Sequence, residues 1–185
     1  MDALEAILTR HSISKVKPDP VPREIIEKLL QAAVQAPNHH QLRPWRFGGL
    51  TGGSRAALGE VMAQELKKKS PEIPDAGMEK ERLKPLRAPV LVAVAVEKSA
   101  DPRVPEIENI CAAAAAMENL LLAAHAEGLG AMWRTGQAVR DLEVKKFLGF
   151  EPDQLVLGFI YIGYPDMEVQ AVERPSYEDR TVWMD

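Results

Sequence analysis

The stretch Pro89-Val90-Leu91-Val92-Ala93-Val94-Ala95-Val96 decides the fold of this chain. Every residue in it is apolar, whereas a strand that buries only one face alternates apolar and polar side chains. The segment therefore predicts a β-strand that is covered on both faces. Such a strand must lie inside the molecule, with other elements packed above and below it.

The segment that follows predicts a long helix, from about Pro105 to Glu127. Its centre is apolar all round, so the helix must lie in a core or in a subunit interface. Gly128 and Gly130 are placed to end it. Polar residues interrupt the segment, and no uninterrupted apolar run approaches the roughly 20 residues that a bilayer requires. We expect a core helix and no membrane span.

The remaining elements follow from apolar spacing and from turn residues. Residues 2 to 10 predict a helix with Asp2 as its N-cap, and a second helix is expected from Pro22 to the break at Pro37. Residues 70 to 87 combine prolines and charges and predict a long, mobile excursion that shapes a binding site. The other expected elements are strands at Trp45–Leu50, Ala131–Arg134 and Leu155–Tyr161, helices at Ser54–Lys69 and Asp141–Leu148, and an extended arm from Pro165 onward.

Length and composition narrow the class of protein. The 185 residues suit one domain, numbered 1–185, and the net charge of -4 gives nucleic acid or an anionic membrane no general attraction. The one cysteine, Cys111, excludes an intrachain disulfide, and its alanine-rich surroundings predict a buried thiol. No secretory leader is recognisable at the first residues, so a cytoplasmic location is expected.

Three polar turns carry the residues that could bind a ligand. The first is Arg10-His11-Ser12, at the end of the first expected helix. A guanidinium gives two parallel hydrogen bonds to a phosphate, and a nearby hydroxyl adds a donor. Taken alone, the pattern is a weak signal, and a positive helix C-cap followed by a turn serine explains it better.

The second turn joins a helix to a strand, from Gln35 to Trp45. Asn38, His39 and Gln41 can both donate and accept hydrogen bonds, as a heterocyclic ring with amide and carbonyl edges requires. The chain offers no cysteine or further histidine at ligand spacing to the two adjacent histidines here. We therefore expect no metal.

The third turn is Gly128-Leu129-Gly130-Ala131-Met132-Trp133-Arg134-Thr135-Gly136. Its tryptophan offers a planar apolar face beside the fixed charge of Arg134. The glycine pattern fits neither a Rossmann fingerprint nor a P-loop. Phosphate binding would therefore depend mainly on arginines.

In their order and spacing these pieces resemble the nitroreductase family, and most of all its compact, YdjA-like subfamily. The matching runs are Arg10–Ser12, Ala36–Phe47, Glu127–Gly136 and Leu157–Gly163. The resemblance implies a three-layer α+β fold, with a central, mostly antiparallel sheet flanked by helices and a C-terminal arm that reaches the partner subunit. It also implies a homodimer with FMN at the subunit interface and NADH or NADPH as the electron donor.

The resemblance further implies roles for individual residues, with FMN carrying the chemistry and no catalytic protein side chain. Leu42 and Arg43 depart from the pattern of larger relatives, so contacts in that loop differ. A basic residue near the C-terminus, either Arg174 or Arg180, is a further candidate for the phosphate. The implied FMN-binding residues are Arg10, His11, Ser12, Gln35, His39, Gln41, Trp133, Arg134 and Thr135, with Gln35 and His39 reaching the other subunit's FMN; the implied nicotinamide-binding residues are Ala123, Ala124, His125, Ala126, Glu127 and Gly128.

The function that follows is an FMN-dependent oxidoreductase. NAD(P)H would reduce the bound FMN, which would then reduce a nitroaromatic, a quinone or a similar acceptor in ping-pong order. A flavin-binding sensor or carrier, a flavin-fragmenting relative and a purely structural dimer are the alternatives. No residue that reads the ribose is identifiable, so NADH and NADPH are not distinguished.

Overall fold

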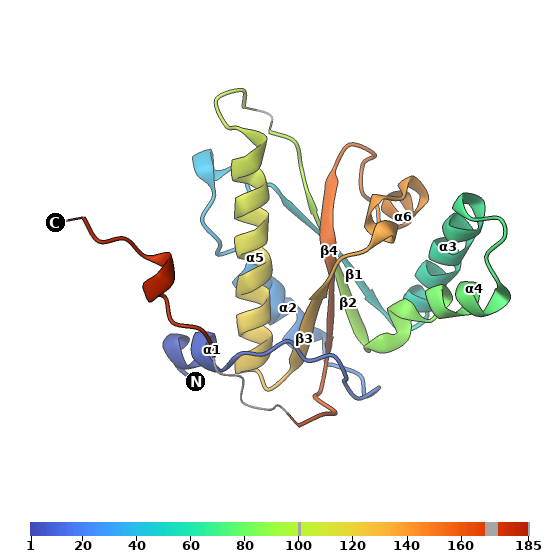
Figure 1. Cartoon of the computed structure of the whole chain (residues 1–185), viewed down its shortest axis with the longest axis horizontal. Coiled ribbons are helices and arrows are strands. Elements are labelled where there is room, and N and C mark those ends of the chain that lie inside the picture. Colours follow the sequence, from blue (N-terminus) through green and yellow to red (C-terminus); the bar gives the residue numbers. More distant parts are fainter. Residues whose placement is uncertain (100, 169–173, 185) are drawn as a thin grey trace.

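The computed structural model describes residues 1–99, 101–168 and 174–184. Its centre is one antiparallel sheet of four strands in the order β1-β2-β4-β3. Helices cover both faces of this sheet (Figure 1). This arrangement confirms the predicted α+β class with an antiparallel sheet. The strands are β1 (Trp45–Thr51), β2 (Val90–Val96), β3 (Gly130–Arg134) and β4 (Leu155–Gly163).

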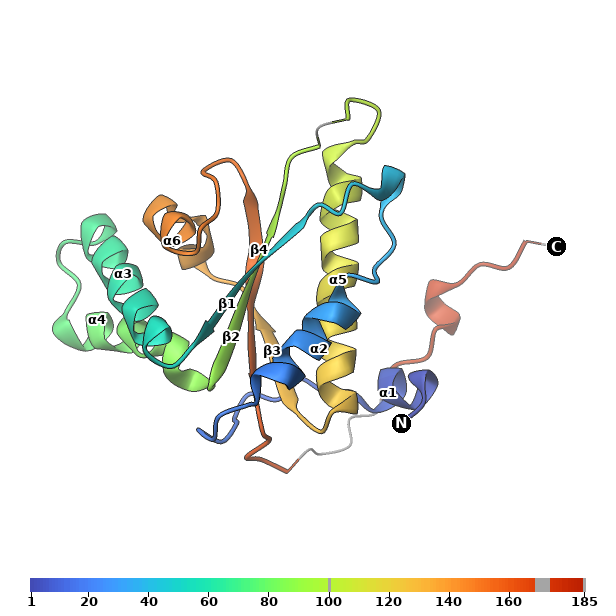
Figure 2. The same cartoon turned by 180° about the vertical axis from the view of Figure 1, so that it is seen from behind.

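The two faces of β2 belong to two different cores, as its continuous apolar sequence predicts. Val90, Val92, Val94 and Val96 pack in the core beneath α2 (Arg23–Ala33) and α5 (Glu106–Ala126). The intervening residues, Leu91, Ala93 and Ala95, pack in the core beneath α3 (Gly53–Lys69) and α6 (Leu142–Phe147). Figure 2 shows α2 and α5 together on one side of the sheet, opposite α3 and α6.

The long helix α5 is a core helix. Its length and composition alone would allow it to cross a membrane. However, Ala113, Ala116, Met117 and Leu120 are completely buried against the sheet and α2. Its outer face holds Cys111, which is exposed, so the prediction of a buried thiol was wrong. Every third or fourth residue of α5 faces the core, and Cys111 falls outside that stripe.

Residues 70 to 87 differ from the predicted mobile excursion. They form α4 (Asp75–Arg82) and the 3-10 helix η2 (Lys84–Arg87). Helix α4 lies against α3 where Gly59 has no side chain, because a Cβ there would stand 2.1 Å from the carbonyl oxygen of Arg82. Close packing of two backbones, which the pattern of prolines and charges does not reveal, orders this segment.

The helices near the N-terminus follow the prediction with small shifts. Helix α1 (Ala3–Thr9) has the expected N-cap, and Asp2 and Glu5 form a capping box. Pro22 is the N-cap of α2 and not its first residue, and α2 ends at Ala33, before Pro37. The short helices are η1 (His39–Gln41), η3 (Gln137–Arg140) and η4 (Glu178–Arg180).

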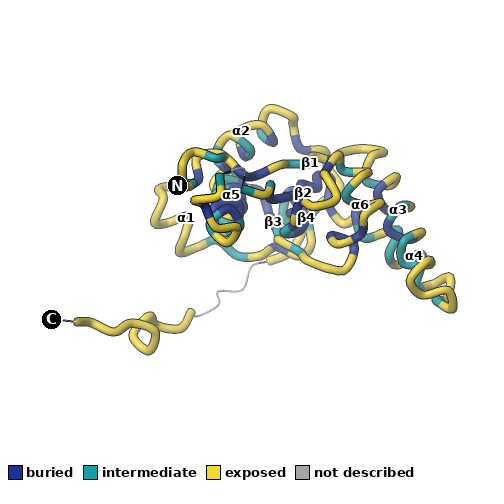
Figure 3. The backbone as a smooth tube through the Cα atoms, turned by 90° about the horizontal axis from the view of Figure 1, so that it is seen from above, coloured by how far each residue is buried: buried dark blue, intermediate teal, exposed yellow. Residues whose placement is uncertain are grey.

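The described part of the C-terminal segment runs along the outside of the molecule. Residues 175 to 184 are exposed, and Figure 3 shows them as a tail that stands away from the body. Tyr177, Val182, Trp183 and Met184 present large apolar side chains to solvent there. The predicted arm thus has no core of its own, and its residues 169–173 lie outside the described part of the chain.

Candidate functional site

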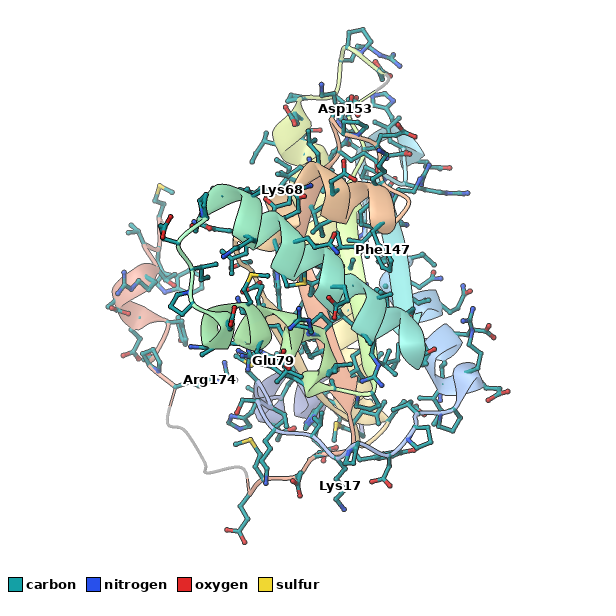
Figure 4. The ribbon with its side chains drawn as sticks, turned by 90° about the vertical axis from the view of Figure 1, so that its right-hand side faces the viewer. Lys17, Lys68, Glu79, Phe147, Asp153 and Arg174 are labelled. Atoms are coloured by element: carbon teal, nitrogen blue, oxygen red, sulfur yellow. The ribbon has the colours of Figure 1, made fainter. Side chains whose placement is uncertain are left out.

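A pocket of about 280 Å³ opens at the end of β3, on the face of the sheet that carries α3 and α4. Figure 4 looks onto this face, with α3 and α4 toward the viewer. Its lining combines apolar and aromatic side chains with polar ones, among which basic groups outnumber acidic ones. The lining residues are Met62, Glu81, Lys84, Arg87, Met132, Trp133, Arg134, Thr135, Gly136, Gln137, Ala138, Phe159 and Tyr161.

The charge of the pocket is positive, with three basic side chains against one acidic side chain. Lys84 forms an ion pair with Glu81. Arg87 and Arg134 have no ion pair within the described residues. The Arg134 guanidinium lies 5.7 Å from the centre of the Tyr161 ring, a cation–π distance. Two guanidiniums are thus available to a ligand with negative charge or carbonyl oxygens.

The Tyr161 side chain forms part of the pocket wall and is largely buried. Burial raises the pKa of its hydroxyl, and the nearby Arg87 and Arg134 oppose that rise. Tyr161 therefore keeps its proton at neutral pH. It offers the pocket an O–H donor and no added charge.

The Trp133 indole is fixed against the neighbouring strand. Its Nε1–H donates a 3.2 Å hydrogen bond to the carbonyl oxygen of Leu157 in β4. The side chain still exposes 37 % of its surface. Trp133 pairs with Ile160, whose side chain packs in the core beneath α2 and α5, so the indole is held on that face of the sheet, behind the pocket.

The turn Arg10–Ser12 lies beside the other end of the same strand. Ser12 forms a parallel bridge with Ala131, and the N–H of Ile13 donates to the Ala131 carbonyl at 3.0 Å. From Ala131 to Arg134 the strand extends about 10 Å. The structure therefore brings the first and third predicted turns together along one strand, as the prediction requires.

The charged side chain of Arg10 in this turn is partly buried. The Nε of Arg10 lies 3.3 Å from a carboxylate oxygen of Glu118 on α5, and its side chain is only 18 % exposed. The Arg174 guanidinium donates a 2.7 Å hydrogen bond to the main-chain carbonyl of Arg10. His11 is half-buried and Ser12 is exposed beside them. Two guanidiniums and a hydroxyl thus gather at one place.

The second predicted turn lies elsewhere, on the α2 and α5 side of the sheet. His39 donates from Nδ1 to Glu108 near the start of α5, at 2.5 Å. Gln35 donates to the carbonyl of Gln31 one turn earlier in α2. The backbone of Gln41 has a positive φ of 54°, an uncommon conformation for a residue other than glycine. Within one chain, none of these three residues lines the pocket at the end of β3.

The predicted nicotinamide segment also lies away from that pocket. Ala123 and Ala126 line an open apolar groove of about 340 Å³ between α1, α2 and α5, together with Gln35. Ala124 is fully buried. The Glu127 carboxylate pairs with Lys28 at 2.6 Å, and Gly128 ends the helix with a φ of 73°.

His125, in the same segment, forms a hydrogen bond with the Thr9 hydroxyl, with 2.8 Å between Nε2 and Oγ1. Burial and the neighbouring charges of Arg10 and His11 lower the pKa of His125, against a smaller opposing effect of Glu5. The imidazole is therefore held in its neutral form at the junction of α1 and α5.

Sequence reasoning missed several residues of the pocket, above all Lys84 and Arg87 on η2. The signal for an ordered segment was present, because Asp75 stands in the first turn of α4 and Lys80 and Arg82 stand in its last turn. That order of charges suits the helix dipole. The segment's involvement in a binding site was predicted, but which of its side chains line the pocket depends on how α4 packs against α3.

The geometry agrees with a comparison over most of the chain. Residues 7–164 match the family model described as the nitroreductase family. The chain belongs to the nitroreductase family. The matched range includes the Arg10 turn and the pocket at the end of β3, and it ends before the C-terminal tail.

Individual relatives of this nitroreductase-family chain agree in sequence and in fold. A protein from Escherichia coli K12 named "Putative NAD(P)H nitroreductase YdjA" is 30% identical over 172 residues, which cover 92% of each chain. The crystal structure of a nitroreductase-like family protein from Bacillus cereus has a TM-score of 0.82 at 22% identity, covering 100% of this chain and 96% of the other. An FMN-dependent nitroreductase, NfnB from Mycobacterium smegmatis in complex with NADPH, has a TM-score of 0.77 at 17% identity, with 99% and 98% covered.

Proposed function

We propose that this chain is an FMN-dependent oxidoreductase that takes a hydride from NADH or NADPH and reduces a small organic acceptor such as a nitroaromatic or a quinone. Family membership and the name of the Escherichia coli relative support the reaction class. The observation that carries the proposal is the pocket at the end of β3, connected along that strand to the Arg10 turn.

The residues of the pocket fit a flavin ring. An isoalloxazine is planar, and it needs an apolar wall along its faces and hydrogen-bond donors at its carbonyl edge. Phe159 and Tyr161 supply aromatic wall, and Lys84 and Arg87 supply donors. Gly136 leaves the backbone open to close approach, since a Cβ placed there would meet no atom within 4 Å.

The phosphate end of FMN fits the Arg10 turn. A phosphate of about two negative charges requires a guanidinium and neutral donors in a partly desolvated site. Arg10, Ser12 and Arg174 provide these groups next to Ala131. The strand length between the two sites suits a nucleotide whose ring and phosphate are joined by an open five-carbon chain.

When bound, FMN supplies the hydride-accepting ring, and the chain's own residues bind and polarise it. Lys84, Arg87 and Arg134 line the pocket, and their positive charge would stabilise the negative charge that a bound flavin ring gains on reduction. The Tyr161 hydroxyl, still protonated, adds a neutral donor. The aromatic and aliphatic floor excludes water from one side of the site.

We further propose that the active form is a homodimer with FMN at the interface. Three exposed apolar side chains, Leu4, Ile7 and Leu8, accompany the apolar groove on the α1 and α5 side. Arg10, which would hold the FMN phosphate, pairs with Glu118 of α5 on this side, so a second copy that covers this face would place its own Gln35, His39 and Gln41 near the phosphate end of the first copy's FMN. This accounts for three predicted residues that lie away from the pocket of their own chain.

The experiment is anaerobic stopped-flow reduction of the FMN-loaded protein. With NADH or NADPH the flavin absorbance should bleach within seconds, and a nitroaromatic or quinone added afterwards should restore it. Parallel initial-rate lines at varied donor and acceptor concentrations would support ping-pong order. Slow or absent bleaching would favour a flavin sensor or carrier, and stoichiometric loss of flavin in air would favour a fragmenting enzyme; either result rejects the proposal.

A further inference from the structure

We propose that Gly158 is a positioning residue: a β-bulge at Leu157 and Gly158 forms the seat of the Trp133 indole, and the seated indole anchors the end of β3 that lines the flavin pocket. The claim about the flavin pocket rests on the proposed function. The claim that the bulge holds the Trp133 indole in one orientation concerns the protein alone.

The bulge is visible in the register between β2 and β4. Val94 pairs with Gly158 and the next residue, Ala95, pairs with Val156, so Leu157 has no partner across the ladder. Gly158 adopts a φ of 152°, a conformation that L side chains rarely reach. A bulge of this kind changes the direction of the backbone groups next to it.

The space over Gly158 is filled by Trp133. A Cβ on Gly158 would lie 2.5 Å from Nε1 of the indole and 2.6 Å from the carbonyl oxygen of Arg134. Real Cβ atoms do not approach other atoms so closely, and the second contact is to backbone, which cannot swing aside. The indole therefore requires glycine at this position.

The extra residue of the bulge supplies the hydrogen bond that holds the indole. Pairing between β3 and β4 ends at Arg134 and Phe159, so the Leu157 carbonyl lies beyond the last pair of the ladder. It accepts the Nε1–H of Trp133 at 3.2 Å. The missing side chain at Gly158 and the free carbonyl at Leu157 together fix one orientation of the ring.

The orientation matters because the indole anchors the end of the edge strand β3. Trp133 pairs with Ile160, so its indole lies on the α2 and α5 face of the sheet, behind the pocket. The residue lines the pocket with the two residues that follow it, Arg134 and Thr135. An indole without its seat would turn out to solvent, and the backbone of both neighbours would lose its anchor. Residues that contact a ligand keep their geometry when the residues behind them are rigid, and here the bulge at Leu157 and Gly158 gives that support.

The test compares Gly158→Ala with Gly49→Ala, each made in a Trp183→Phe background. Gly49 is the matched control, since it lies in β1 and a Cβ there meets nothing within 4 Å. Trp45 is 5 % exposed, so iodide quenching of the remaining fluorescence reports mainly on Trp133. In the flavin-free protein, Gly158→Ala should raise the quenching constant about twofold, and Gly49→Ala should leave it unchanged.

The second readout is the Kd for FMN, from quenching of flavin fluorescence. Gly158→Ala should weaken binding about tenfold, the size expected when the displaced strand end loses one hydrogen bond to the ligand, and Gly49→Ala less than twofold. Because Gly158→Ala can also impair folding, Trp133→Phe and Trp133→Ala test the role independently. The phenylalanine variant keeps a ring but loses the donor, and it should bind FMN more weakly than the parent and more tightly than the alanine variant.

The two measurements test the two claims separately. Unchanged iodide quenching in folded Gly158→Ala would overturn the claim that Gly158 holds the Trp133 indole in place. Unchanged FMN affinity in Trp133→Ala would overturn the role in the pocket, and so would a loss of thermal stability without a loss of affinity. A parent protein that binds no FMN would reject the proposed function and the role in the pocket, while the iodide measurement would still decide the seating.

Discussion

The guanidinium of Arg174 donates a 2.7 Å hydrogen bond to the main-chain carbonyl oxygen of Arg10. This bond joins the beginning of the C-terminal tail to the turn after α1. Sequence alone left Arg174 and Arg180 as equal candidates for the phosphate. The structure places Arg174 at the Arg10 turn, whereas Arg180 pairs with its exposed neighbour Asp179 at 3.0 Å.

Arg174→Ala should therefore weaken FMN binding, and Arg180→Ala should not. A charge-assisted hydrogen bond to phosphate contributes roughly 1.5–3 kcal/mol, so we expect an increase in Kd of roughly 10- to 100-fold for the first variant. Both residues lie on the same tail, which makes Arg180→Ala the matched control. Equal affinities for the two variants in an FMN titration would refute the assignment of Arg174.

Arg10→Ala should lower FMN affinity by a similar factor while the fold stays intact. Its ion pair with Glu118 is partly exposed and contributes at most about 1 kcal/mol to stability. Arg23→Ala, which removes an exposed ion pair with Glu27 on α2, is the control for charge. Circular dichroism and urea unfolding should be nearly the same for both variants. An unchanged Kd for Arg10→Ala would show that the phosphate lies elsewhere.

The stability of the protein should depend on pH through His125. Burial, Arg10 and His11 lower the pKa of this imidazole in the folded state below its unfolded value of 6.5. The unfolded chain therefore takes up the proton more readily, and this contribution to stability is present above pH 6.5 and is lost as the pH falls toward the folded pKa. His125→Gln should lose less free energy of unfolding between pH 7 and pH 5 than the parent in urea titrations. An identical pH slope in both proteins would contradict this interpretation.

Ile7→Lys should convert the proposed homodimer into monomers. The Ile7 side chain is 52 % exposed and lines the apolar groove between α1 and α5, so a lysine there would place a charge in the proposed interface. Leu142→Lys, at a leucine that is 60 % exposed on α6, is the control on the opposite side of the sheet. Sedimentation velocity should give a monomer for the first variant only, with weaker FMN binding because the partner's residues are absent. A dimer in both variants would remove the α1 and α5 face from the proposal.

The sequence predicted the centre of the fold because single residues there report their surroundings directly. The unbroken apolar run of β2 requires two cores, and the alternate packing of Val92 and Ala93 confirms it. The apolar centre of α5 places that helix in the core in the same way. Caps such as Asp2 are equally local signals, and the structure bears them out.

Features that depend on two distant segments escaped prediction. The order of residues 70–87 depends on the contact of Gly59 with Arg82, which no local pattern reveals. The seat of Trp133 requires a bulge in β4, about two dozen residues further along the chain. Cys111 is exposed although the next two residues, Ala112 and Ala113, are buried. Which side of the helix a residue lies on cannot be predicted from the composition of the segment.

The candidate site was predictable as a list of turns but not as one pocket. Arg10, Ser12 and Trp133 were predicted together, and β3 connects them. Lys84 and Arg87 were not predicted as lining residues, because their position follows from the packing of α4. His39 lies beside Glu108, away from the pocket, so its predicted contact with FMN depends on the proposed homodimer.

An equilibrium titration of the flavin-free protein with FMN tests the central claim most directly. The account predicts saturable binding with one FMN per chain, a shifted flavin spectrum, and loss of most of that affinity in an Arg10→Ala, Arg174→Ala double variant. A titration in which FMN fluorescence and absorbance remain those of free flavin at every protein concentration would contradict the account.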